Sequence, residues 1–341
     1  MDENKMFSVV IPVYNGEKTL GRTLASLISS KDYIHEVIIV DDHSEDNTLL
    51  ISDDFMQFFP IYLLSSDGYH NPSMARKTGL LQATGEWITF VDADDCLTPS
   101  SLRYVKKQID ERSYMNLVLL HTQTIYYESG TFAPENIGHS DNSCGGNFYK
   151  RQYLIDSGLF PHDTLKKSED EYWNTIITKY VELLDGTDAK IDRYDYPVYE
   201  VHHDFDDGLS YALENWTEYA IKYHLLSNQY IVEYFIPLMD TYDTLKKDLE
   251  FTYINNFVFV YYLFQALIQE ETDIIDIEQE KNYFRKALEF YIKTFGGSKE
   301  SMYIYYIKHE DAIHTMYAGA RDSIGHDFEM VETFFDFLHE L

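Results

Sequence analysis

Short apolar runs and amphipathic segments alternate along the first 200 residues of the chain. Runs typical of buried strands occupy positions 7–13, 36–40, 61–65, 87–91 and 116–122. Segments with apolar residues at helical spacing lie between them, at 17–29, 73–85 and 100–111. Strands that alternate with helices predict an α/β fold with a mainly parallel, doubly wound sheet.

From residue 211 onward the apolar spacing is helical throughout. The chain is therefore predicted to form two domains, an α/β domain over residues 1–210 and an all-α module over residues 211–341. The apolar stripes of the module are expected to form its own core and a docking face. A homo-oligomer interface is the alternative use of the same stripes.

Polar residues gather where the predicted strands end. Tyr14 and Asn15 follow the first strand, Asp41 and Asp42 end the second, and three aspartates within 92–95 follow the fourth. Carboxyl ends of parallel strands form the ligand-binding edge of such sheets. The sequence therefore predicts a ligand site at this edge.

The segment Asp92-Ala93-Asp94-Asp95 concentrates negative charge at the end of an apolar strand. In an extended chain, Asp92 and Asp94 point to the same side. Two carboxylates so placed repel each other unless a cation lies between them, and oxygen ligands suit Mg²⁺ or Mn²⁺. The alternative is a polar turn in which Asp95 caps the helix near Pro99.

Other polar segments allow both a functional and a purely structural interpretation. Arg76 and Lys77 lie at a predicted helix start, which is favourable for binding an anion, or on a solvated helix face. The acids 169–171 precede an apolar helix and complement its dipole. His202 and His203 end a strand-like run beside acidic residues, so they are either structural or ligands of a cation.

Further phosphate-related classes fit the sequence poorly. Asp41 and Asp42 could be the acidic pair of a phosphorylation receiver, but they follow the second strand rather than the first, and Ser44 indicates a helix start. Dinucleotide-binding and P-loop proteins also fit poorly, because neither a G-x-G-x-x-G pattern nor a Walker A loop follows the first strand.

The composition narrows the set of partners. The 341 residues carry a formal net charge of −31, which opposes binding to nucleic acid or to an anionic membrane and makes an anionic acceptor less expected. Two cysteines fit a reducing, cytoplasmic setting. The start of the chain lacks a signal-peptide pattern, and the apolar run 257–268 is shorter than a transmembrane helix requires. The 30 tyrosines and 21 phenylalanines supply core contacts or a sugar-stacking surface.

An ordered set of motifs extends over about residues 6–210. They are SVVIPVYNGEKTLGRTLASL, EVIIVDDHSEDNT, NPSMARKTGLLQATGEWITFVDADDCLTP, CGGNFYKRQYL, SEDEYW and VYEVHHDFDDGLS. Together they resemble the family 2 glycosyltransferases, which have the GT-A fold. The segment from 211 onward resembles no family that we can name.

The resemblance implies a role for each matching residue. The residues expected to bind the nucleotide-sugar donor are Pro12, Tyr14, Asp41, Arg76 and Asp92. Of these, Tyr14 stacks on the base, Asp41 hydrogen-bonds it, Arg76 lies near the diphosphate, and Asp92 lies beside the ribose or the metal.

The same resemblance implies a metal site and a catalytic base. Asp94 is expected to ligate Mn²⁺ or Mg²⁺ directly, with Asp92 and either His202 or His203 completing the site. Asp170 matches the general base. The spacing after the two histidines is longer than in the family, and Lys77 stands where asparagine is commoner.

The implied function is an inverting, metal-dependent transfer of a sugar from a UDP-sugar to a hydroxyl of a glycan, a lipid-linked oligosaccharide or a protein. One alternative is a catalytically degenerate protein that binds nucleotide-sugars and serves in assembly. The other is a nucleotidyltransferase, although the segment IPVYNGEKTL is a poor version of that class's glycine-rich loop.

Overall fold

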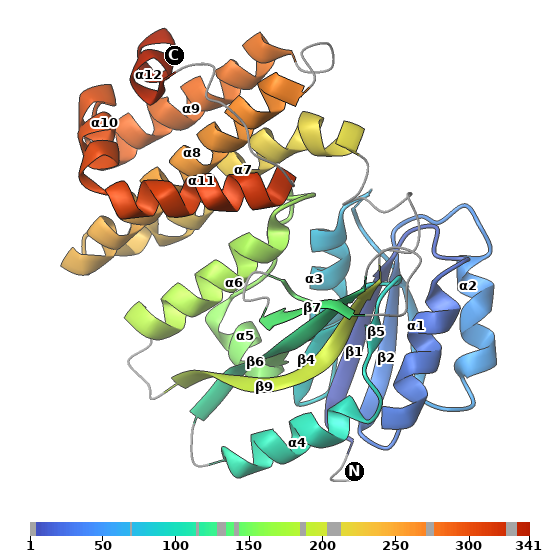
Figure 1. Ribbon diagram of the computed structural model, residues 1–341. Coiled ribbons are helices and arrows are strands. Elements are labelled where there is room, and N and C mark those ends of the chain that lie inside the picture. Colours follow the sequence, from blue (N-terminus) through green and yellow to red (C-terminus); the bar gives the residue numbers. More distant parts are fainter. Residues whose placement is uncertain are drawn as a thin grey trace. The chain divides into compact units, whose positions relative to one another are not determined.

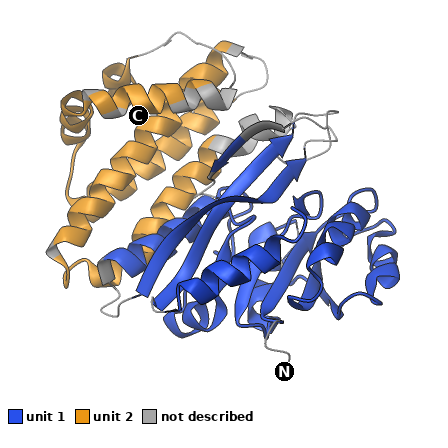
Figure 2. Ribbon diagram, turned by 60° about the horizontal axis from the view of Figure 1, so that its bottom comes forward, with its two compact units in different colours: residues 1–206 blue, residues 207–341 orange. Residues whose placement is uncertain are grey.

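The computed structural model describes residues 5–68, 70–113, 116–127, 134–139, 143–184, 189–202, 213–270, 276–324 and 333–341. The chain forms two compact units, residues 1–206 and residues 207–341 (Figure 2). The first unit is built around a β-sheet and the second from helices (Figure 1).

The described part of the first unit contains a nine-stranded sheet, in the order β3-β2-β1-β4-β8-β6-β9-β5 with β7 paired to β6. The strands are β1 (Phe7–Val13), β2 (Ile34–Asp41), β3 (Ile61–Ser65), β4 (Trp87–Phe90), β5 (Cys96–Leu97), β6 (Asn116–Tyr127), β7 (Pro134–His139), β8 (Phe148–Lys150) and β9 (Ala189–His202). The pairs β3–β2, β2–β1, β1–β4 and β6–β9 are parallel.

Helices cover both faces of this sheet, because alternate strand residues point in opposite directions. Val9 and Ile11 of β1 join one core cluster with residues of α1 (Leu20–Leu27) and α4 (Ser101–Glu111). Val10 faces the other way, against α3 (Pro72–Gln82): a Cβ on Gly79 of that helix would lie 2.3 Å from Val10 Cγ1. The remaining α-helices of the unit are α2 (Thr48–Ile51), α5 (Arg151–Ser157) and α6 (Glu169–Lys179).

The sheet is mixed rather than mainly parallel, because β5, β7 and β8 run antiparallel to their neighbours. Two predicted helix boundaries are wrong. The helix α2 begins at Thr48 rather than Ser44, and α3 ends at Gln82 rather than Gly85. Gly85 instead passes so close to Ser8 that an added Cβ would lie 2.6 Å from its hydroxyl.

The second unit is helical in all its described parts, as predicted. Its helices are α7 (Leu213–Phe235), α8 (Asp243–Glu270), α9 (Ile277–Phe295), α10 (Lys299–Lys308), α11 (Glu310–Ile324) and α12 (Phe334–Glu340). Its core is rich in aromatic rings that contact each other, for example Phe257 with Phe284 and Tyr261 with Phe337.

The apolar part of α8 is longer than the sequence analysis assumed. Residues 244–269 are long and apolar enough to cross a membrane by length and composition, so the argument from the short run 257–268 does not hold. The most apolar window of this stretch is 67% buried inside the structure, and the core helix of a soluble protein passes the same test.

Candidate functional site

The first strands of the sheet end level with one another. Val13 pairs with Asp41, and Asp41 pairs with Ser65. The backbone N–H of Val91 donates to the carbonyl of Val10 at 3.0 Å, which brings the segment after β4 to the same edge. Pro12 is tolerated in this central strand because β4 has already ended opposite Val10.

The segment Asp92–Asp95 is a turn, not a continuation of the strand. The backbone N–H of Asp95 donates to the carbonyl of Asp92 at 3.0 Å. Helix α1 anchors the turn, since Thr23 Oγ1 donates to the carbonyl of Ala93 at 2.9 Å and Arg22 donates to that of Asp94 at 2.5 Å. The prediction assumed an extended backbone that places Asp92 and Asp94 on one side, and this assumption is wrong because the backbone forms a turn.

The two carboxylates nevertheless influence each other. Residue Asp94 is exposed, but the protein around its carboxyl group partly desolvates it, and with the charge of Asp92 this raises the pKa of Asp94 to about 6. No ion pair reaches the Asp94 carboxylate within the described residues. Both side chains offer only oxygen donors, and such donors suit Mg²⁺ or Mn²⁺.

Arg76 joins the Asp92 turn to the start of α6. One guanidinium nitrogen lies 2.8 Å from Asp92 Oδ1, and the other lies 2.7 Å from Glu169 Oε1 and 3.3 Å from Asp170 Oδ1. Arg76 is 4% exposed. Burial alone would lower its pKa, but Asp170, Asp92 and Glu169 together raise it well above the usual value. The guanidinium is therefore fixed in its charged form between three carboxylates.

Asp170 lies in the first turn of α6, and a loop holds one of its oxygens. The backbone N–H of Cys144 donates to Asp170 Oδ2 at 3.0 Å. The other oxygen, Oδ1, is buried and accepts no hydrogen bond among the described residues, although Arg76 lies 3.3 Å from it. Burial raises the pKa of the neighbouring Glu169, and the charge of Asp170 adds to this effect while Arg76 opposes it.

Asp95 does not cap a helix, contrary to the alternative prediction. Its buried carboxylate accepts from the Tyr199 hydroxyl at 2.8 Å and from the His202 backbone N–H at 3.0 Å. The helix α4 begins after Ser100, which makes no side-chain cap. Burial raises the pKa of Asp95 well above its usual value, and the charges of Asp94 and Asp92 contribute.

Tyr199 connects this turn with the loop that holds Asp170. Its hydroxyl accepts the backbone N–H of Asp92 at 3.0 Å while donating to Asp95. Its ring lies against Gly145 and Gly146, where an added Cβ would come within 2.6 Å of Tyr199 atoms. The two glycines, directly after Cys144, are therefore required for close approach.

The residues predicted to hold the nucleotide base lie where β1 and β2 end, and hydrogen bonds join the two loops that follow these strands. Tyr14 is 40% exposed and its ring lies 4.1 Å from that of His70. Asp41 is 8% exposed and accepts the Ser44 backbone N–H at 3.2 Å. Asp42 is also buried, but it accepts the Asn71 backbone N–H at 2.5 Å at the start of α3.

His202 is grouped with residues other than the predicted metal ligands. Its imidazole Nε2 lies 3.3 Å from Glu200 Oε2. Among the described residues, the group of three or more donor atoms that all lie within 4.8 Å of one another belongs to Cys96, Glu200 and His202, without Asp92 or Asp94. His203 lies outside the described residues.

The sequence analysis overlooked several residues of this region. Glu169 was assigned to the helix dipole, yet it contacts Arg76 directly. Tyr199 and Cys144 were given no role, although the glycine pair after Cys144 was a signal of close backbone approach. Lys77 pairs with Asp163 and lies 5.8 Å from the Phe160 ring centroid.

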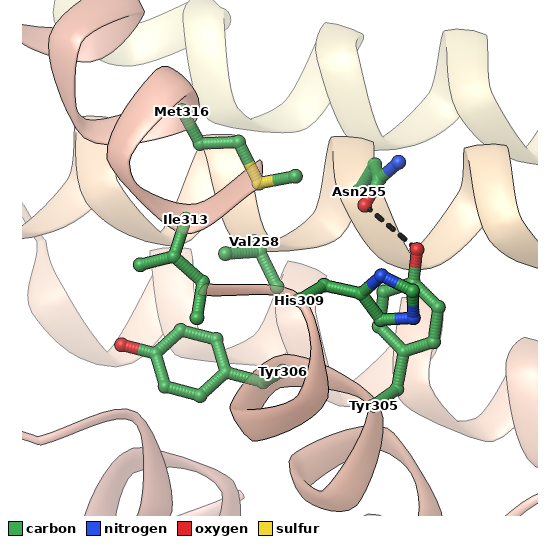
Figure 3. A pocket seen from close by; sticks show the side chains of 7 residues that line it. All are labelled: Asn255, Val258, Tyr305, Tyr306, His309, Ile313 and Met316. Atoms are coloured by element: carbon green, nitrogen blue, oxygen red, sulfur yellow. Dashed lines mark hydrogen bonds between the residues drawn. The ribbon is translucent and has the colours of Figure 1, made fainter. Parts of the chain in front are cut away.

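The helical unit contains a small hollow between α8, α10 and α11 (Figure 3). Its lining residues are Asn255, Val258, Tyr305, Tyr306, His309, Ile313 and Met316. These side chains leave no enclosed space even for a water molecule, so the hollow does not hold a sugar. The aromatic residues of this unit serve mainly as core.

Comparison with known proteins identifies the N-terminal unit. Residues 8–157 match the sequence model described as Glycosyl transferase family 2. The N-terminal unit belongs to glycosyl transferase family 2. The recognition made from the six motifs is thereby confirmed.

Relatives of this chain include two bacterial proteins. "Minor teichoic acid biosynthesis protein GgaA" of Bacillus subtilis is 28% identical over 200 residues, covering 51% of this chain and 44% of GgaA. "Poly(ribitol-phosphate) beta-N-acetylglucosaminyltransferase TarS" of Staphylococcus aureus is 36% identical over 184 residues, covering 48% of this chain and 31% of TarS. The chain thus spans less than half the length of these two relatives.

The fold of the chain is also similar to that of a solved structure over most of its length. The crystal structure of S. aureus TarS residues 1–349 aligns with a TM-score of 0.58 at 20% identity, covering 95% of this chain and 93% of that one. A complex of the same TarS fragment with UDP-GlcNAc aligns with the same TM-score at 19% identity. The predicted fold class, a GT-A type α/β domain followed by an all-α module, is confirmed.

Proposed function

We propose that this chain is an inverting glycosyltransferase that moves a sugar from a UDP-sugar to a hydroxyl group of an acceptor. The observation that carries the proposal is the Arg76 cluster, which brings the Asp92 turn and the Asp170 carboxylate together beyond the ends of parallel strands. The crystal structures of the TarS fragment in complex with UDP and with UDP-GlcNAc support UDP-GlcNAc as the first donor to test.

The loops after β1 and β2 hold the base in this proposal. The exposed ring of Tyr14, next to Pro12, offers a stacking surface. Asp41 uses part of its acceptor capacity on the Ser44 N–H, and a carboxylate has capacity left for an N–H of the base. These assignments follow from the family resemblance, and the 40% exposure of Tyr14 suits the stacking role.

Asp94 and Asp92 are the proposed cation ligands, with Mn²⁺ or Mg²⁺ as the cofactor. Their oxygen donors and the raised pKa of Asp94 support this choice. A divalent cation held there would offset the negative charge of the donor diphosphate. The participation of His202 or His203 stays a prediction.

Asp170 is the proposed general base. The Cys144 N–H and Arg76 hold the Asp170 carboxylate in place, and the side chain keeps an exposure of 23%, so that the carboxylate can take the proton from the acceptor hydroxyl. The acceptor oxygen then bonds to the anomeric carbon as the bond from that carbon to the diphosphate breaks, and UDP leaves with the bonding electrons. One displacement of this kind inverts the configuration of the sugar.

The structure changes the role that we propose for Arg76. Its guanidinium is shared by Asp92, Glu169 and Asp170 rather than directed at open space, so it acts by positioning these carboxylates. Because the guanidinium is planar and rigid, its two terminal nitrogens fix the direction from Asp92 on one side to Glu169 and Asp170 on the other.

We also propose an acceptor class, a cellular setting and a role for the helical unit. The likeness to GgaA, a teichoic acid biosynthesis protein, and to TarS, a poly(ribitol-phosphate) transferase, favours phosphate-containing polymers as the first acceptors to assay, although the net charge of −31 opposes them. Two free, buried cysteines support a reducing, cytoplasmic setting. We assign acceptor binding or self-association to residues 211–341.

The test replaces Asp170 by asparagine, which keeps the size of the side chain and removes the base. Turnover of UDP-GlcNAc should fall by about 10²–10⁴-fold, while Mn²⁺-dependent UDP binding stays near that of the wild type. Glu171→Gln, in the same helical turn, removes the same charge and should keep turnover. Near-normal turnover of Asp170→Asn would exclude this base, and a wild type that binds UDP without any turnover would favour the degenerate alternative.

A further inference from the structure

Three side chains with different donor atoms converge next to the Asp92–Asp95 turn. They are a thiol (Cys96), a carboxylate (Glu200) and an imidazole (His202), and one donor atom of each lies within 4.8 Å of the others. Cys96 follows the turn directly, and the other two residues end β9. Cys96 and Glu200 have no role in the proposed UDP-sugar reaction, and His202 enters it only as the alternative to His203.

Strand pairing explains why these three residues meet. Cys96 of β5 lies directly opposite Glu200 of β9 in the antiparallel register. His202 is two residues further along β9, so it shares a face with Glu200. The donors are therefore placed by the backbone of the sheet, and the arrangement does not depend on a chance approach of long surface side chains.

The imidazole is also held in orientation. Its ring stacks on Tyr127 of β6 with the ring centroids 4.8 Å apart and an interplanar angle of 6°. Its Nε2 lies 3.3 Å from Glu200 Oε2. In a tetrahedral zinc site with ligand distances of about 2.0–2.3 Å, ligand atoms lie roughly 3.3–3.8 Å apart, so this pair already has suitable spacing.

We propose that Cys96, Glu200 and His202 form a binding site for a zinc-like transition metal ion, separate from the Mn²⁺ or Mg²⁺ site at Asp94. Sulfur and nitrogen donors select Zn²⁺ over the hard cations, whereas the Asp92–Asp94 set offers oxygen alone. Three protein ligands leave a fourth position for water. Glu200 and His202 retain side-chain exposures of 20% and 15%, so an ion can reach them from solvent.

Binding of the ion would connect β5 to β9 beside the turn. The thiol of Cys96 releases its proton to solvent as the sulfur–metal bond forms. The His202 backbone N–H already holds Asp95 at 3.0 Å, so fixing the His202 ring also restrains the residue that ends the Asp92–Asp95 turn. The bound ion would thus restrain the turn, and it would take no part in the chemistry of transfer.

Cobalt provides the test, because a thiolate bound to Co²⁺ gives a charge-transfer absorption band. The full chain, freed of metal with a chelator, is titrated with Co²⁺ and then with Zn²⁺. We expect one equivalent of Co²⁺ to produce the band in the wild type and Zn²⁺ to remove it. Cys144→Ser, which changes the other cysteine, and Asp94→Asn should both keep the band, whereas Cys96→Ser should lose it.

Two further variants keep the thiol, and they test the metal site even if Cys96→Ser does not fold. His202→Gln and Glu200→Gln should each weaken Zn²⁺ binding more than about tenfold in competition with a chromophoric chelator, since loss of an outer partner alone costs about 10–100-fold. Absence of the band in the wild type, its persistence in Cys96→Ser, its loss in Asp94→Asn, or unchanged zinc affinity in both glutamine variants would each overturn the proposal.

Discussion

Replacing Tyr199 by phenylalanine removes one hydroxyl group and leaves the ring in place. This hydroxyl donates to Asp95 at 2.8 Å and accepts from the Asp92 N–H at 3.0 Å, in a side chain that is 1% exposed. We expect the variant to lose stability and, because the turn that carries Asp92 and Asp94 loosens, to lose metal-dependent UDP binding as well.

The magnitude follows from the two bonds that are lost. Each leaves a buried polar group without its partner, at a cost of about 1–3 kcal/mol per group, and relaxation of the turn recovers a part. A net loss of about 2 kcal/mol in the free energy of unfolding is therefore expected. For a unit of 150–250 residues this corresponds to a fall in Tm of roughly 4–8 °C.

The assay compares Tyr199→Phe with Tyr253→Phe by thermal unfolding and by UDP titration with Mn²⁺. Tyr253, in the helical unit, also loses one buried hydroxyl bond, at 2.8 Å to the carbonyl of Ala287, so it controls for stability alone. Tyr199→Phe should weaken UDP binding about tenfold, equal to ~1.4 kcal/mol, and Tyr253→Phe should not. Loss of stability with unchanged UDP affinity in Tyr199→Phe would refute the positioning role.

Three other predictions concern the same region. Arg76→Met leaves three carboxylates without their cation and should lower the free energy of unfolding by ~3 kcal/mol at pH 7. The loss should be smaller at pH 5, where carboxylates protonate, and equal losses in denaturant titrations at both pH values would contradict this. Gly146→Ala should destabilise the protein more than Gly158→Ala, because both have positive φ (73° and 67°) but an added Cβ meets Tyr199 at the first and nothing within 4 Å at the second; equal melting temperatures would argue against the close contact. The pKa of Asp94 is raised to about 6 and the cation needs the deprotonated form, so Mn²⁺-dependent UDP affinity should fall as the pH drops below 6; a pH-independent affinity between pH 5 and 7 would contradict the assignment. The metal-free protein should instead gain stability from this group over the same interval, because its folded state binds the proton more tightly than the unfolded state does.

Much of the N-terminal fold was readable because its strands are apolar on both faces. The run 61–65 was predicted with the bounds that β3 has, and the strand ends at Val13 and Asp41 form the expected polar edge. The prediction that 61–65 is buried is wrong, because β3 is an edge strand in which Tyr62 and Leu63 are exposed. The antiparallel strands were missed for a physical reason. Strand β5 has two residues and β8 has three, too few to give a period, and their pairing depends on partners far along the chain.

The candidate site was predicted by residue type, but not by geometry. The alternation of side chains along a strand could not reveal that Asp92–Asp95 is a turn, since the turn is set by hydrogen bonds to α1 and to Tyr199, 107 positions away from Asp92. The contact of Arg76 with Glu169, 93 positions later, likewise depends on the folded arrangement. Such long-range pairings carry no periodic signal in the sequence.

Calorimetric titration of UDP with and without Mn²⁺, on the wild type and on Asp94→Ala, tests the central claim most directly. We expect Mn²⁺ to strengthen UDP binding to the wild type by at least about tenfold and Asp94→Ala to abolish this gain. Equal UDP affinity with Mn²⁺ and with chelator, or an undiminished gain in Asp94→Ala, would contradict a metal-dependent sugar-nucleotide site at the Asp92–Asp95 turn.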